Sequence, residues 1–425
     1  MGSSVLLVLL LVVVAGCTGP SGGHSGTPEI QRLLDARAAA VLDRNAGAFL
    51  TTVDPRATGF RDRERRMFAN LAEVPLADWR YELVRTGAFD LPAAGSGDRR
   101  VAAEVRLRYR LDGYDTAPVT AVQYLTLVDR DGRWRIASDA DGARTGRRTA
   151  RQLWDQGPVD LVRGRHSIVL GAGDPGRLRE LAERTDAAVP AVRKAWPGKW
   201  AGRVVVQAPA SLERMAQLLG ATDPSGYRGI AAVTTGETGA ASGATPADRV
   251  IVNPEAYEEL NDLGRQIVLT HETTHVATRT ATTPATPLWL SEGFADWVAY
   301  RGTKRPAGIA APELSRAVAT GRTPRALPAD GDFTFSRDAD QLAQAYEGGW
   351  LACRMIADKW GERRLTSFYQ AVGRRTTPAD PAEGTAADRS GARAHGVRQA
   401  LRAELGVDLG EFTRAWRAYV VGALD

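Results

Sequence analysis

Two histidines and a glutamate near the middle of the chain are arranged as a metal-binding motif. They lie in the stretch His271-Glu272-Thr-Thr-His275, inside a segment whose apolar spacing predicts a helix from about Gly264 to Thr278. Residues four apart on a helix lie about 40° apart around the axis and one turn apart in height, so both imidazoles can reach one ion. Neutral imidazole is a good zinc ligand. Glu272 is placed to act as general base toward a water at the metal.

Composition and context favour a real site over a chance match. The chain has only five His, and two of them fall in this motif. A match by composition alone is expected on the order of once in a few hundred chains of this length. The alternative is an exposed polar patch on a helix. The neighbouring residues Ile267, Val268 and Leu269 are apolar, which predicts a mostly buried helix, and buried ionisable groups need a partner.

A zinc site with two histidines needs a third protein ligand, either a carboxylate or another histidine. No further His follows before His395. Downstream lies Leu-Trp-Leu-Ser-Glu292-Gly-Phe-Ala-Asp296-Trp, after a gap that accommodates a helix end, a loop with two prolines and a second helix.

H-E-x-x-H followed by W-L-x-E-G-F-A resembles the gluzincin metallopeptidases, especially the group of aminopeptidase N and leukotriene hydrolase. The resemblance covers roughly residues 160–425 and implies a thermolysin-like zincin domain with a mixed sheet and a helical C-terminal subdomain. It implies zinc as the cofactor and Glu292 as the third ligand beside His271 and His275. Asp296 resembles the aspartate that orients a zinc histidine in E-x-x-x-D motifs, here His271.

A second segment extends this resemblance. Ala-Tyr346-Glu-Gly-Gly-Trp-Leu resembles the stretch in which these enzymes carry a tyrosine that hydrogen-bonds the tetrahedral intermediate, which implies that role for Tyr346. A phenol suits a developing oxyanion. The G-x-M-E-N loop with which the aminopeptidases hold a substrate's amino terminus is absent, so exopeptidase specificity is not implied. Residues 229–235 are predicted to form an edge strand able to bind an extended peptide by β-addition.

The N-terminus reads as a targeting signal. Residues 5–15 form a run of eleven apolar residues, whereas a membrane-spanning helix needs about 20. The run fits a signal peptide (1–16), and its end at Ala-Gly-Cys17 resembles a bacterial lipobox. This predicts a diacylglycerol on Cys17, a flexible tether (17–27) and a protein anchored to the outer face of the cell membrane. The leader lacks the usual Lys or Arg, and an uncleaved anchor with an incidental Cys is the alternative.

Residues 28–146 predict a small α+β roll. Apolar spacing indicates helices over 29–50 and 61–71, and alternation indicates antiparallel strands after them. The turn Asp131-Gly132 predicts a tight hairpin. Helices followed by a curled sheet resemble the cystatin-like or nuclear-transport-factor-like roll. From His166 onward, strands alternate with helices, and the chain becomes mostly helical after the metal motif.

Bulk composition narrows the remaining possibilities. The net charge is +5 and Arg is scattered through the chain rather than clustered, so no nucleic-acid partner is expected. The Arg- and Ala-rich composition is typical of a GC-rich coding sequence such as an actinobacterial one. Cys353 is expected to be buried packing. The sequence therefore predicts a membrane-anchored, extracytoplasmic zinc peptidase with peptide or protein substrates. The alternative is a catalytically degenerate binding lipoprotein with the same fold.

Overall fold

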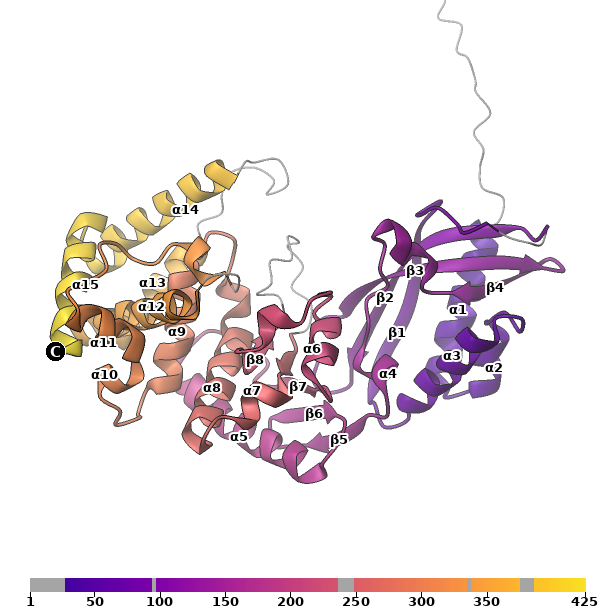
Figure 1. Cartoon of the computed structure of the whole chain (residues 1–425), viewed down its shortest axis with the longest axis horizontal. Coiled ribbons are helices and arrows are strands. Elements are labelled where there is room, and N and C mark those ends of the chain that lie inside the picture. The colour runs from indigo at the N-terminus through magenta and orange to yellow at the C-terminus, as the bar shows by residue number, and fades with distance from the viewer. Residues whose placement is uncertain (1–26, 94–96, 236–247, 335–337, 375–385) are drawn as a thin grey trace, which may run out of the picture.

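The computed structural model describes residues 27–93, 97–235, 248–334, 338–374 and 386–425. Cys17 and the predicted signal peptide lie outside the described residues. The chain is α+β, as predicted, with one antiparallel and one mixed sheet and a large helical region. Figure 1 shows these parts in a row, with the mixed sheet between the antiparallel sheet and the C-terminal helices.

An antiparallel sheet with helices packed against it forms the first part of the chain. Its strands follow one another in sequence order. Asp131 and Gly132 join the last two strands with φ of 54° and 75°, as a two-residue hairpin turn requires, so the predicted hairpin is confirmed. The elements are α1 (Thr27–Leu42), α2 (Ala46–Thr51), α3 (Thr58–Asn70), β1 (Leu76–Thr86), β2 (Arg100–Leu111), β3 (Val119–Arg130) and β4 (Arg133–Ser138).

The prediction of one helix over 29–50 is wrong. The helix ends at Leu42 and a second one starts at Ala46, with Arg44 at φ 54° between them. The Asn45 side chain caps the second helix by accepting the N–H of Ala48 at 3.0 Å. The apolar spacing continues across the break, so periodicity alone does not reveal it.

The mixed sheet follows, with strand order β5-β6-β7-β9-β8. The three inner strands are parallel, and each outer strand runs antiparallel to its neighbour. The predicted edge strand over 229–235 is present but shorter: it is β8, one of the two outer strands of this sheet. The elements are α4 (Leu153–Gln156), β5 (Asp160–Arg163), β6 (Ser167–Gly171), α5 (Pro175–Ala195), β7 (Val204–Ala208), α6 (Leu212–Leu218), β8 (Ala232–Thr234), β9 (Val250–Val252), α7 (Pro254–Glu258) and α8 (Asp262–Thr278).

The rest of the chain is helical. Its core is rich in aromatic side chains, and Cys353 is buried within it, as predicted. Across the described ranges, no helix is both long and apolar enough to cross a membrane. The helices are α9 (Leu288–Tyr300), α10 (Ala307–Ala310), α11 (Pro312–Ala319), α12 (Ala339–Trp360), α13 (Glu362–Gly373), α14 (Ala386–Ala400) and α15 (Leu409–Leu424), with a π-helical turn at Leu401–Leu405.

The two sheets share one hydrophobic core. Ile168 and Leu170 of β6 and Val205 of β7 belong to the apolar cluster that fills the antiparallel sheet. A buried ion pair adds to this contact: Arg249 donates to both carboxylate oxygens of Asp115, at 2.8 and 2.7 Å. The side chains of Arg249 and Asp115 are 4% and 2% exposed. The N-terminal helices and their antiparallel sheet are therefore packed firmly onto the mixed sheet.

This ion pair predicts a large mutational effect. Asp115→Ala leaves the Arg249 guanidinium buried without its carboxylate, which should lower the free energy of unfolding by about 3–5 kcal/mol. Denaturant unfolding of the folded variant measures this loss.

The matched control is the exposed pair Arg106–Glu82, whose atoms lie 3.1 Å apart. Glu82→Ala should cost under about 1 kcal/mol. Equal losses in the two variants would contradict the structural role given to Asp115.

Candidate metal centre

The two motif histidines lie on α8, which starts at a side-chain cap. Asn261 accepts the N–H of Gly264 at 2.9 Å and fixes the first turn of the helix. Two turns further on, the Nε2 atoms of His271 and His275 lie 2.9 Å apart. Both rings thus point to the same place, as the four-residue spacing predicts.

Glu292 reaches the same place from α9. Its Oε2 lies 3.3 Å from Nε2 of His271 and 3.4 Å from Nε2 of His275. Donors about 2.0–2.2 Å from a tetrahedrally coordinated ion lie roughly 3.3–3.5 Å from one another. The two distances to Glu292 match this spacing, whereas the two histidine nitrogens lie closer together, at 2.9 Å. This buried group could hold a metal ion.

The electrostatics of this centre reflect its need for positive charge. Burial acts most strongly on His271 and tends to lower its pKa, but the charge and hydrogen bond of Asp296 outweigh it and raise that pKa well above 6.5. Burial likewise tends to raise the pKa of Glu292, and the charge of His275 with hydrogen bonds from both histidines lowers it instead. A cation bound there would supply the same compensation as protons on the two imidazoles.

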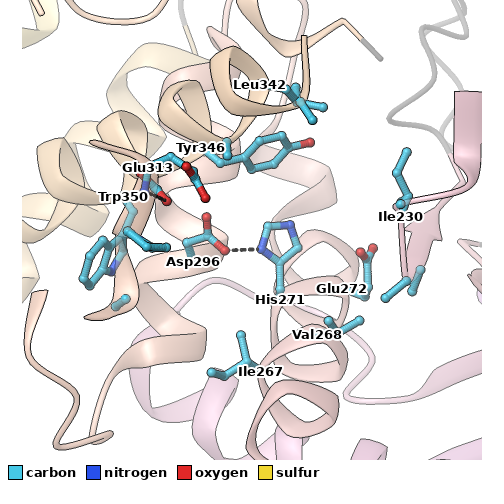
Figure 2. A pocket seen from close by; sticks show the side chains of 18 of the residues that line it. Ile230, Ile267, Val268, His271, Glu272, Asp296, Glu313, Leu342, Tyr346 and Trp350 are labelled. Carbon is cyan, nitrogen blue, oxygen red and sulfur yellow. Dashed lines mark hydrogen bonds and ion pairs between the residues drawn. The ribbon is translucent and has the colours of Figure 1, made fainter. Parts of the chain in front are cut away.

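Asp296 lies behind His271, one turn further along α9 than Glu292. Its Oδ1 lies 2.8 Å from Nδ1 of His271, shown as the dashed line in Figure 2. A carboxylate at this distance accepts a hydrogen bond from Nδ1–H, so that Nε2 is the nitrogen that the neutral ring offers to a metal. The structure thus places Asp296 where it can orient His271.

Glu272 is buried and held by a residue that the sequence did not single out. Thr234 of β8 donates its hydroxyl to Oε2 of Glu272 at 2.6 Å. Thr234 is fully buried. No sequence signal marks it, because β8 and α8 meet only through tertiary packing and alternation does not tell which strand residue will face Glu272.

An ion pair and a hydrogen bond connect the residues next to β8 and β9 with the end of α8. Arg279, just past the end of α8, donates to Asp248 at 2.9 Å and to the carbonyl of Thr235 at 2.8 Å. Arg249 follows Asp248 directly and pairs with Asp115 of the roll. The position of Thr234 against Glu272 is therefore tied to both α8 and the N-terminal roll.

Tyr346 lies on α12 and lines the same cavity as His271 and Glu272. Figure 2 shows its ring above His271. The ring packs edge-on against Phe333, with centroids 5.2 Å apart. Of the predicted site residues, His271, Glu272, Tyr346 and Asp296 line this cavity. His275 and Glu292 meet His271 but are not part of the wall.

Close helix packing makes this arrangement possible. An added Cβ on Gly293 would overlap the carbonyl of Gly349, and one on Gly349 would lie 2.7 Å from the carbonyl oxygen of Trp289. The backbones of α9 and α12 thus touch directly. The glycines in the two sequence motifs therefore set the distance between the helix of Glu292 and the helix of Tyr346.

No model of a known protein family matches this chain, and no curated protein is similar to it in sequence. The interpretation of the centre rests on its residues and their geometry, and the resemblance to gluzincins remains a prediction.

The metal centre predicts a defined stoichiometry. The purified protein should carry one metal ion per chain, and Glu292→Ala or His275→Ala should lower the content below about 0.1, because two remaining donors hold an ion weakly. Elemental analysis after gel filtration measures this content.

His395→Ala, which removes an exposed imidazole outside the centre, is the control and should retain the full content. Removing the metal with a chelator should also lower the melting temperature of the wild type, since an ion that binds only the folded state stabilises it. Retention of a full equivalent by Glu292→Ala would contradict the ligand assignment.

The glycine contact predicts a second effect. Gly349→Ala should destabilise the protein by about 1–3 kcal/mol, because α9 and α12 must separate to make room. Denaturant unfolding tests it against Gly422→Ala in α15, where an added Cβ meets nothing within 4 Å. The free energy of unfolding of Gly422→Ala should be unchanged or slightly higher. An unchanged free energy of unfolding in Gly349→Ala would show that the helices do not touch.

Proposed function

We propose that this protein is a zinc-dependent peptidase of the gluzincin type, anchored by a lipid on Cys17 to the outer face of the cell membrane. Residues 160–425 would form a thermolysin-like zincin domain and residues 28–146 a cystatin-like roll. The observation that carries the proposal is the convergence of His271, His275 and Glu292 on one point. His271 also lines a cavity together with Glu272.

The donor set favours zinc. Two imidazoles and one carboxylate leave a fourth position of a tetrahedron for water or substrate, as catalytic zinc sites do. Zinc held by His271, His275 and Glu292 would polarise the scissile carbonyl and lower the pKa of a water molecule toward about 7.

Glu272 would serve as the general base. Its carboxylate would take the proton of the attacking water and pass it to the amine that leaves. The hydrogen bond from Thr234 holds Oε2 in place. A carboxylate fixed in this way needs no rearrangement before the proton transfer, which favours the reaction.

Tyr346 would stabilise the charge that develops on the carbonyl oxygen, by donating a hydrogen bond from its phenol. The substrate would lie in the extended conformation along β8, which is an outer strand of the mixed sheet. Backbone hydrogen bonds to such a strand bind peptides of varied sequence. This supports a peptide substrate over a small ester or amide.

The proposal predicts that Glu272→Gln keeps its metal and loses activity. Removal of a general base should reduce kcat/KM on peptides by about 10²–10⁴-fold, measured with a peptide library and with casein. Thr234→Val should show a smaller loss, about tenfold, because only one hydrogen bond is lost.

Glu362→Gln is the control, since Glu362 is an exposed partner of Arg301 far along the chain from the motif. Normal turnover by Glu272→Gln would refute the mechanism. A zinc-loaded wild type that cleaves no peptide would instead indicate a binding protein.

A further inference from the structure

A cavity of about 680 Å³ adjoins the candidate metal centre. His271, Glu272 and Tyr346 contribute to its wall, so a peptide bound for cleavage must place part of itself there. Much of the remaining wall is apolar and comes from α8 and α12, including Ile267 and Trp350. Such a wall accommodates the hydrocarbon part of a side chain.

Apart from His271, the ionisable acidic and basic side chains that line this cavity are all carboxylates. Four carboxylates line it, and among its described lining residues none is Lys or Arg. This contrasts with a chain that carries 55 basic residues and a net charge of +5. A concave site lined by one sign of charge concentrates the opposite charge.

The carboxylates occupy two ends of the cavity. In Figure 2, Asp296 and Glu313 lie on one side of His271, and Glu272 and Ile230 lie on the other. Glu272 and Asp296 already serve the metal centre. The carboxylates that the proposed reaction does not use, Glu313 and Glu347, belong to the wall formed by α11 and α12.

Glu347 is the better placed of these two. Its carboxylate accepts the backbone N–H of Leu314 at 2.6 Å and that of Glu313 at 3.2 Å, one on each oxygen. Each carboxylate oxygen has a second acceptor position, so Glu347 is held rigidly yet can bind another donor. Glu313 pairs with Arg316, which lies outside the lining.

We propose that this cavity binds a lysine or arginine side chain of the peptide substrate, with Glu347 as its principal contact and Glu313 beside it. The inference rests on the proposed peptidase function and names its substrate class. The hydrocarbon stem of the basic residue lies along Ile267 and Trp350, and its cationic head reaches the carboxylates. A neutral side chain of equal length leaves these carboxylates without a partner.

The pKa of Glu347 is raised, so a cation in the cavity competes with a proton for its carboxylate. Burial raises the pKa of Glu347 to about 7, and the negative charge of Asp296 adds to this rise, against the opposing hydrogen bond from Leu314 and the charge of Arg316. A cation in the cavity stabilises the ionised form.

Matched peptides test the proposal. Substrates that differ only in lysine against norleucine, or arginine against citrulline, keep the stem and change the charge. At one position near the cleaved bond, the wild type should show a kcat/KM about 10–100-fold higher for the charged member, the size expected of a charge-assisted hydrogen bond.

Glu347→Gln should reduce this preference to below about threefold. Glutamine still accepts the backbone N–H of Leu314 but loses the bond from that of Glu313, so the melting temperature of the variant is measured alongside. Glu362→Gln, outside the cavity, should keep the full preference. Equal cleavage of charged and neutral peptides by the wild type, or an unchanged preference in Glu347→Gln, overturns the inference.

Direct binding separates this inference from the proposed function. The metal-loaded Glu272→Gln protein should bind the lysine peptide more tightly than the norleucine peptide, measured by calorimetry, whether or not the wild type is a hydrolase. Peptide cleavage without a charge preference refutes only the inference. Absence of cleavage together with charge-selective binding refutes only the peptidase function.

Discussion

The candidate metal centre depends on burying several ionisable groups where α8 and α9 pack together. His275, Glu272 and Glu292 are all buried, and each would be costly to place there alone. The ligand atoms of His271, His275 and Glu292 lie within 4.8 Å of one another, where one cation could compensate them, and Glu272 accepts a hydrogen bond from Thr234. This convergence requires α8 and α9 to approach closely. The packing of the neighbouring helices must allow that approach.

Glycines on α9 and α12 extend the same constraint to a third helix. Since the backbones touch at Gly293 and Gly349, α12 has little freedom to slide or rotate relative to α9. Tyr346 is one turn from Gly349 on α12, and so its distance from the metal ligands is fixed by backbone contact rather than by adaptable side chains. Backbone contacts of this kind position groups more accurately than loops do.

The features predicted correctly from the sequence are those set by local spacing. The positions of His271 and His275 on one helix face and the Asp131-Gly132 hairpin both depend on a few consecutive residues. The contacts of Thr234 with Glu272 and of Asp115 with Arg249 join segments far apart in the chain. No local pattern encodes them. The helix break at Arg44 also depends on distant residues, because the Arg44 guanidinium donates to the carbonyls of Leu71 and Val74.

The shared core of the two sheets has a consequence for the autonomy of each part. Ile168, Leu170 and Val205 belong to strands of the mixed sheet, yet their apolar surface is covered by the N-terminal roll. A shortened chain that starts at the mixed sheet would expose this surface to water and would tend to aggregate. The N-terminal part and the mixed sheet are therefore expected to unfold together. A chimaera that replaces either part would have to replace the apolar residues on both sides of their interface.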